Sequence, residues 1–251
     1  MQFRSNSVFI WLLVLLTAPG WSVLLDSSDL LHAQTVTAQS SQIVIDDFES
    51  YGNGALPVKW KAQLNGKLVP LTEQFVDDNE WFYAKQEGRR KFVRAYANGE
   101  AVHVSKENGD GYSWDLKTHP LLAWDWRAEH LPEGAREDKD DRNDSGAAVY
   151  VIFSVDGFIL KRPKSIKYVY SSTLPVGTVV NYGKLQVIVA SSALDGTGQW
   201  LSVERDVEAD YRRVFNEKPP SKPILIRLWA DSDNTRSKAT ADFDNIKVLE
   251  R

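Results

Sequence analysis

The chain has 251 residues, a formal net charge of −4 at pH 7 and no cysteine. This length permits one large all-β domain or barely two small domains. The lack of cysteine excludes disulfides, thiolate metal sites and a cysteine nucleophile. The mild acidity, without any basic run, argues against nucleic acid as a partner.

The first residues carry the pattern of a secretory signal. Arg4 precedes an unbroken apolar run over Val8–Ala18. The run is shorter than the roughly 20 residues that a spanning helix needs, so the pattern favours a cleaved signal over a membrane anchor. We therefore expect a signal peptide over residues 1–33, with cleavage after Ala33 or Ala38.

The polar residues 34–41 are expected to form a disordered linker, and residues 42–251 one domain, because no further Pro/Ser/Gly linker divides the chain. Export without cysteine is typical of a bacterial envelope protein. We expect the mature protein to be periplasmic or secreted, with no mature membrane span.

Many short segments rich in β-branched and aromatic residues follow one another, separated by Gly, Pro and Asn-Gly turns. This spacing predicts a mainly-β fold, a two-sheet β-sandwich of the jelly-roll type. The expected strands lie at 43–48, twice within 59–69, and at 81–85, 91–97, 101–105, 121–132, 147–155, 166–171, 179–182, 185–190, 199–204, 224–229 and 239–248.

One amphipathic helix is predicted over Asp206–Phe215. Its apolar residues recur at helical spacing, Asp206 is suited to cap the start, and Pro219-Pro220 follows the end.

The segments 121–132 and 147–155 flank a loop, 133–145, that is too charged to be buried. The second segment is apolar on both faces, which predicts a strand in the middle of a sheet. The first segment alternates tryptophan with Asp125 and Arg127. We interpret the two segments as a central strand pair. The loop is expected to be solvated, or alternatively to form a lid or a calcium-ordered loop over a groove.

The alternation of strand side chains isolates several charged and aromatic residues on otherwise apolar segments. A charge on a buried strand costs several kcal/mol unless it is paired. The residues therefore form internal ion pairs, such as Arg127 or Arg227 with Glu204, or their face opens as a groove. A groove of arginine, carboxylate and tryptophan suits a sugar. The predicted ligand-binding residues are Arg127, Trp200, Glu204, Arg227, Trp229 and Asp231.

Two groups of acidic residues are candidate metal sites. The run Asp231–Thr235 fails as an EF-hand loop and favours a turn with self-capping side chains. Glu49 and Asp244 lie near the first and last strands. If these strands are neighbours, the two carboxylates would share a structural Ca²⁺ ion. No other cofactor is expected.

Four blocks of the chain resemble a bacterial family of unknown function, domain-of-unknown-function family 3047. They are His119–Pro132, Ser165–Thr178, Trp200–Phe215 and Leu228–Ile246. The resemblance implies an exported, bacterial, β-rich protein and assigns no catalytic residue. Ile45–Glu49 and Ala241–Val248 also look like the end strands of galactose-binding-like jelly rolls, which include many carbohydrate-binding modules.

Three functional hypotheses remain. The first is a non-catalytic carbohydrate-binding protein of the bacterial envelope, with a polysaccharide or glycan as its partner. The second is a glycoside hydrolase or polysaccharide lyase in which Glu204 and Asp231 are the two carboxylates. The third is a structural or partner-binding envelope protein, which an exposed apolar patch would favour.

Overall fold

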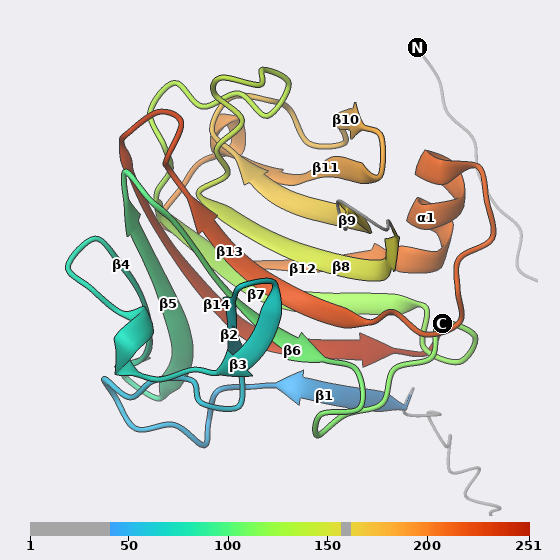
Figure 1. The fold of residues 1–251 in the computed structure, drawn as a ribbon, viewed down its shortest axis with the longest axis horizontal. Helices are drawn as coiled ribbons and strands as arrows, with labels where there is room; N and C mark the ends of the chain where they lie inside the picture. The colour runs from blue at the N-terminus through green and yellow to red at the C-terminus, as the bar shows by residue number, and fades with distance from the viewer. Residues whose placement is uncertain (1–40, 157–161) are drawn as a thin grey trace, which may run out of the picture. The chain divides into compact units, whose positions relative to one another are not determined.

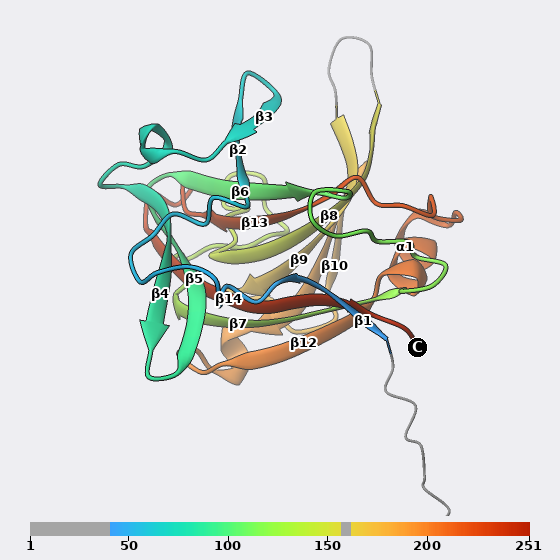
Figure 2. The ribbon, with the colours of Figure 1, turned by 90° about the horizontal axis from the view of Figure 1, so that it is seen from below.

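The computed structural model describes residues 41–156 and 162–251 (Figure 1). These residues form two packed β-sheets, which Figure 2 shows edge-on as two layers. The expected signal peptide and nearly all of the expected linker lie outside the described residues. Within the described part of the chain, no helix combines the length and the apolar character that crossing a membrane would require.

The first sheet, sheet A, has six strands. Along its path are β12 (Leu201–Asp206), β7 (Leu121–His130), β14 (Lys238–Leu249), β5 (Arg90–Asn98) and β4 (Glu80–Glu87), and β1 (Gln42–Asp46) pairs with β14.

The second sheet, sheet B, has eight strands, and within the described residues only its β9–β11 pair is parallel. In spatial order they are β10 (Val179–Tyr182), β11 (Leu185–Ser192), β9 (Arg162–Ser171), β8 (Ala147–Asp156), β13 (Leu225–Asp231), β6 (Ala101–Glu107), β2 (Lys61–Leu64) and β3 (Lys67–Pro70).

The predicted mainly-β two-sheet sandwich with one α-helix is confirmed for the described residues. Helix α1 (Val207–Phe215) begins where expected, because the Asp206 side chain accepts a hydrogen bond from the Ala209 backbone N–H. Two 3₁₀ turns, η1 (Glu73–Phe75) and η2 (Ala193–Asp195), complete the elements. The Asn65-Gly66 turn joins β2 to β3, with both residues at positive φ as a tight hairpin turn requires.

The core lies between the two sheets and is rich in large aromatic side chains. Trp60, Trp114, Trp124 and Trp126 are all fully buried. Each large aromatic buries roughly 150–250 Å², which stabilises the fold by at most about 4–6 kcal/mol per residue. Most of the tryptophan enrichment therefore serves packing.

The expected central strand pair is wrong. β7 belongs to sheet A and β8 to sheet B, so the loop 131–146 crosses from one layer to the other. β8 does lie in the middle of its sheet, between β9 and β13, as its doubly apolar pattern predicted. Alternation along a strand shows which residues share a face, but it does not show which strand is the neighbour.

Candidate functional site

Ion pairs cover part of the outer face of sheet A. Asp242 is fully buried, and its carboxylate accepts hydrogen bonds from Arg94 Nε at 2.6 Å and from Arg127 NH2 at 2.6 Å. Arg90 bridges Asp125 and Asp244 at 2.6 and 2.7 Å. These charged side chains therefore pair with one another and form an electrostatic network within the protein.

Trp200 belongs to this network. The Arg90 guanidinium lies 3.6 Å from the centre of its ring, and Arg127 lies 5.0 Å from it. Phe92 meets the same ring edge-on at 5.3 Å. A sugar would have to displace a stacked arginine to use the covered ring face.

The outer face of sheet B has a different character. Trp229 on β13 stacks on its cross-strand neighbour His103 on β6, with ring centres 4.4 Å apart and planes 6° from parallel. On the other flank, Tyr150 on β8 lies 5.5 Å away. The Arg227 guanidinium is 5.7 Å from the Trp229 ring. All four side chains are half-buried. We call the outward residues His103, Tyr150, Lys167, Arg227, Trp229 and Asp231 the sheet-B face.

Several buried polar atoms of the sheet-B face, or of the loop above it, have no hydrogen-bond partner among the described residues. They are His103 Nδ1, Trp229 Nε1, Asp231 Oδ1 and Glu137 Oε1. An unsatisfied buried polar group costs about 1–3 kcal/mol, so a concentration of such groups indicates a place where a ligand or solvent completes the bonding.

A cavity of about 320 Å³ opens beside Tyr150 on this face. Its polar lining comes from the strands and from the loop 131–146, and its apolar lining from Leu185 and Val187 on β11. Lys167, Tyr150, Asp231 and Glu137 are among the polar residues. The volume falls at the lower end of the range for small-molecule sites.

The electrostatics of the cavity depend on burial. Burial raises the pKa of Asp231 to about 7, against the opposing effect of Lys167, whose Nζ lies 4.0 Å from Asp231 Oδ2. Burial also raises the pKa of Glu137, although Ser171 donates a hydrogen bond of 2.6 Å to its carboxylate. Two carboxyl groups with raised pKa values and one buried ammonium therefore meet in one cavity, a combination frequent at functional sites.

The loop 131–146 is fixed above the cavity. The Tyr182 hydroxyl donates to the Glu137 carbonyl at 2.6 Å, and the Thr173 hydroxyl donates to the Ala135 carbonyl at 2.8 Å. The Asp231 backbone N–H donates to the Ser145 carbonyl at 3.1 Å. Despite its many exposed charges, the loop is tied to sheet B along its length.

The six predicted ligand-binding residues do not share one surface. Arg127 and Glu204 belong to sheet A and Trp200 directly precedes its strand β12, whereas Arg227, Trp229 and Asp231 lie on β13 of sheet B. The expectation of a single groove that includes all six is wrong, because equal parity on two strands places them on one surface only when the strands share a sheet.

The alternatives built on these residues change accordingly. Arg127 pairs with Asp242, and not with Glu204 as expected. Arg227 donates to Ser105 Oγ at 2.9 Å and to Gln63 Oε1 at 2.8 Å. Glu204 is exposed beside a cavity of about 420 Å³ on sheet A, so the structure does not bring the carboxylates of Glu204 and Asp231 together as a catalytic pair.

The expected calcium pair, Glu49 and Asp244, depends on the first and last strands being neighbours. β1 and β14 are neighbours, as the prediction required. The Asp244 carboxylate, however, accepts a hydrogen bond from Arg90 Nε at 2.7 Å, which supplies its counter-charge. Glu49 is exposed, and its backbone carbonyl accepts from Lys91 Nζ at 2.6 Å. The shared calcium ion at Glu49 and Asp244 stays a prediction.

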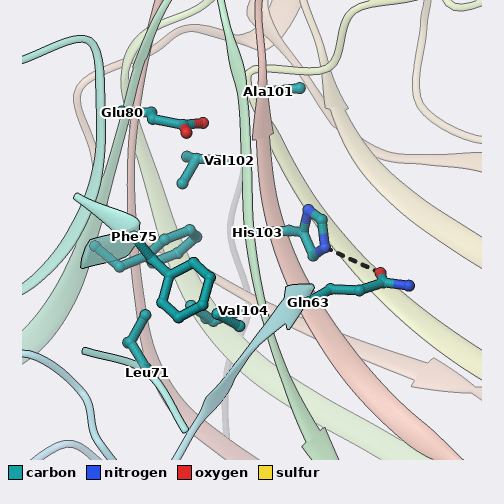
Figure 3. A pocket seen from close by; sticks show the side chains of 10 residues that line it. Gln63, Leu71, Phe75, Glu80, Ala101, Val102, His103 and Val104 are labelled. Atoms are coloured by element: carbon teal, nitrogen blue, oxygen red, sulfur yellow. Dashed lines mark hydrogen bonds between the residues drawn. The ribbon is translucent and has the colours of Figure 1, made fainter. Parts of the chain in front are cut away.

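A second cavity, of about 220 Å³, lies at the other flank of His103 (Figure 3). His103 and Gln63 point toward one another there, 3.3 Å apart, opposite the apolar side chains of Phe75 and Leu71. Glu80 is at the end of this cavity, and burial raises its pKa.

Sequence reasoning missed the residues that other elements bring to the sheet-B face. They are His103, Glu137, Tyr150, Lys167 and Tyr182. The sequences of β8 and β9 could have indicated Tyr150 and Lys167, because each is a side chain with a polar group in a mostly apolar strand. Glu137 gave no signal, because it lies within a charged loop.

Comparison with known proteins places the chain in a family. The model of a family described as a protein of unknown function (DUF3047) matches residues 71–247. The chain belongs to this family. The resemblance found in the sequence is thereby confirmed, and no curated protein matches the chain significantly.

Two carbohydrate-binding modules from Clostridium thermocellum are structurally similar to this DUF3047 member. One is the family 11 module of the cellulosomal cellulase Lic26A-Cel5E, with 11% identity, a TM-score of 0.42, and coverage of 84% of this chain and 96% of the module. The other is the family 30 module of the cellulosomal cellulase Cel9D-Cel44B, with 12% identity, the same TM-score, and coverage of 84% and 98%.

Proposed function

We propose that this protein is an exported, non-catalytic carbohydrate-binding β-sandwich whose ligand lies on the sheet-B face. The observation that carries the proposal is the half-buried Trp229 stack beside a polar cavity, with buried polar atoms that no described protein group satisfies.

The aromatic part of the face supplies apolar contact. Trp229, Tyr150 and His103 form a row across three adjacent strands, and their exposed parts are available to the C–H surface of a sugar ring. Amphipathic aromatic side chains suit a ligand that has apolar faces and a polar rim.

The polar part of the face supplies hydrogen bonds to hydroxyl groups. Lys167 is a donor, the Glu137 and Asp231 carboxylates are acceptors when ionised, and Tyr150 lies between them at the same cavity. Charge-assisted hydrogen bonds are roughly twice as strong as neutral ones, so a few such groups fix the orientation of a sugar.

The export part of the proposal rests on the first 33 residues, where a basic residue precedes a short apolar run. The intact mass of protein recovered from a periplasmic extract tests it, with a chain beginning after Ala33 or Ala38 as the expected result.

Binding is tested with a panel of neutral and acidic polysaccharides in affinity gel electrophoresis. Trp229→Ala is expected to weaken binding at least about tenfold, which corresponds to ~1.4 kcal/mol. Trp200→Ala is the matched control and is expected to bind like the wild type, because Trp200 is a half-buried tryptophan next to β12 of sheet A whose ring is covered by Arg90.

Glu137→Gln provides a second variant that keeps the size of the side chain and an acceptor for Ser171. It should weaken binding without loss of stability in urea unfolding. Lack of retention on every polysaccharide, or loss of retention in Trp200→Ala but not in Trp229→Ala, would contradict the proposal.

A further inference from the structure

Oxygen ligands from two separate segments meet at the rim of sheet B. One carboxylate oxygen each from Asp144, Asp231 and Asp233 lies within 4.8 Å of the others. Asp144 lies near the end of the loop 131–146, Asp231 is the last residue of β13, and Asp233 follows that strand. The segments are held together because the Asp231 N–H donates to the Ser145 carbonyl, and the Asn234 N–H donates to Asp144 Oδ1 at 3.1 Å.

Two amide side chains extend this cluster. The Asn234 side-chain oxygen faces Asp144 Oδ1 and Asn143 Oδ1 at 3.2 Å each, and Asp233 Oδ1 at 2.9 Å. Oxygens that share one calcium ion at about 2.4 Å lie roughly 3 Å apart, so the spacing is that of a coordination shell. If the Asn234 amide is reversed, its NH₂ group donates hydrogen bonds to the same three oxygens. The position of this amide is therefore compatible with both a hydrogen-bonded turn and an ion site.

Asp231 provides the independent observation. The residue is only 8% exposed, and its Oδ1 is buried without a hydrogen-bond partner among the described residues. The nearest cation, Lys167 Nζ, lies 4.0 Å from the other oxygen, Oδ2. A buried carboxylate oxygen without a hydrogen-bond partner, beside two further carboxylates, is an acceptor that a bound cation would complete.

We propose that Asn143, Asp144, Asp231, Asp233 and Asn234 bind one Ca²⁺ ion, which fixes the end of the loop 131–146 to β13. The donor set is entirely oxygen, with three carboxylates and two amides and no histidine, which suits a hard cation. Irregular loop geometry favours Ca²⁺ over the strictly octahedral Mg²⁺. The site differs from the Glu49 and Asp244 pair and stands whether or not the sheet-B face binds a glycan.

The site connects to the cavity through shared residues, since Asn143 and Asp231 also line it. The ion would therefore hold the wall of the cavity that the loop provides. Removal of the ion should therefore increase the mobility of the loop 131–146 more than it destabilises the sandwich.

The test uses the purified protein after treatment with EDTA and dialysis. Calcium chloride titrated in a calorimeter is expected to bind with a stoichiometry of one, and with a dissociation constant of about 10⁻⁶–10⁻³ M. Magnesium chloride should bind much more weakly. Calcium should also slow tryptic cleavage in the loop, where Arg136, Lys139 and Arg142 are exposed.

Asp233→Asn is the decisive variant, because Asp233 is exposed and its substitution leaves the buried packing intact. It should weaken calcium binding at least about tenfold and abolish the protection of the loop. Asp141→Asn removes an exposed carboxylate of the same loop outside the cluster and should behave like the wild type.

Two results would overturn the proposal. One is no heat of binding and no protection at millimolar calcium. The other is calcium binding that persists in Asp233→Asn but is lost in Glu49→Gln, which would place the ion at the first and last strands.

Discussion

At the scale of single residues, His103 shows how a strand position acquires an unusual ionisation state. Its ring is stacked on Trp229, and the Arg227 guanidinium lies nearby. Burial, with a contribution from Arg227, lowers the pKa of His103 to about 3. The imidazole is therefore neutral in the folded protein throughout the physiological range.

This depressed pKa predicts a loss of stability in mild acid. In the unfolded chain the His103 imidazole is protonated below a pKa of about 6.5, whereas in the folded protein it stays neutral down to about pH 3. The free energy of unfolding therefore falls as the pH drops from about 6.5 toward 3. At pH 5 the loss is at most about 2 kcal/mol, and solvent screening of the half-buried ring reduces it. Urea unfolding at pH 7 and pH 5 measures it.

The comparison needs two histidine variants. His103→Gln should remove this part of the pH dependence, whereas His130→Gln, at an exposed position, should retain it. An equal loss in wild type and His103→Gln would show that the stack does not exclude the proton.

At the scale of elements, the loop 131–146 connects the two sheets and adds its own residues to the cavity on sheet B. Gly146 lies where this loop enters β8, and an added Cβ would come within 2.7 Å of the Leu131 and Pro132 side chains. The two ends of the loop thus lie in close contact, and the space at position 146 accepts only a glycine.

Gly146→Ala is expected to destabilise the protein by about 1–3 kcal/mol, the usual cost of overpacking. Gly52→Ala is the matched control, because nothing lies within 4 Å of its added Cβ. Chemical denaturation compares the two. Equal stability of both variants would mean that the loop ends yield without cost.

At the scale of the whole sandwich, the first strand, β1, pairs with the last, β14, in sheet A, and Asp46 at the end of β1 connects this pair to sheet B. Asp46 accepts hydrogen bonds from Trp60 Nε1 at 2.9 Å and from the Tyr51 hydroxyl at 3.1 Å. Its Oδ2 also lies 3.7 Å from the Nζ of Lys106, a residue of β6.

Asp46→Ala should cost about 2–4 kcal/mol, because it leaves the buried indole N–H of Trp60 without its acceptor and the buried ammonium of Lys106 without its counter-charge. Asp47→Ala, one residue later and exposed, should be close to wild type. Thermal and urea unfolding measure the loss of stability in each variant. Similar losses in Asp46→Ala and Asp47→Ala would contradict a special role for Asp46.

Much of the fold was predictable, because the strands carry their own local signals. The Asn65-Gly66 hairpin, the doubly apolar β8 and the capped helix α1 depend on turn chemistry and periodicity within a few residues of each other. The candidate site was only half predictable. Trp229, Arg227 and Asp231 were identified from alternation on β13, but their actual neighbours come from β6, β8, β9 and a loop.

The sequence by itself determined the mainly-β sandwich, the position of the helix, the family and the faces on which side chains lie, because these follow from local periodicity and from recognisable blocks of residues. Only the tertiary structure decided that β7 and β8 are in different sheets, that Arg127 pairs with Asp242, and that Asp144 meets Asp231. Pairing between distant strands depends on the packing of whole faces, and no short stretch of sequence encodes it.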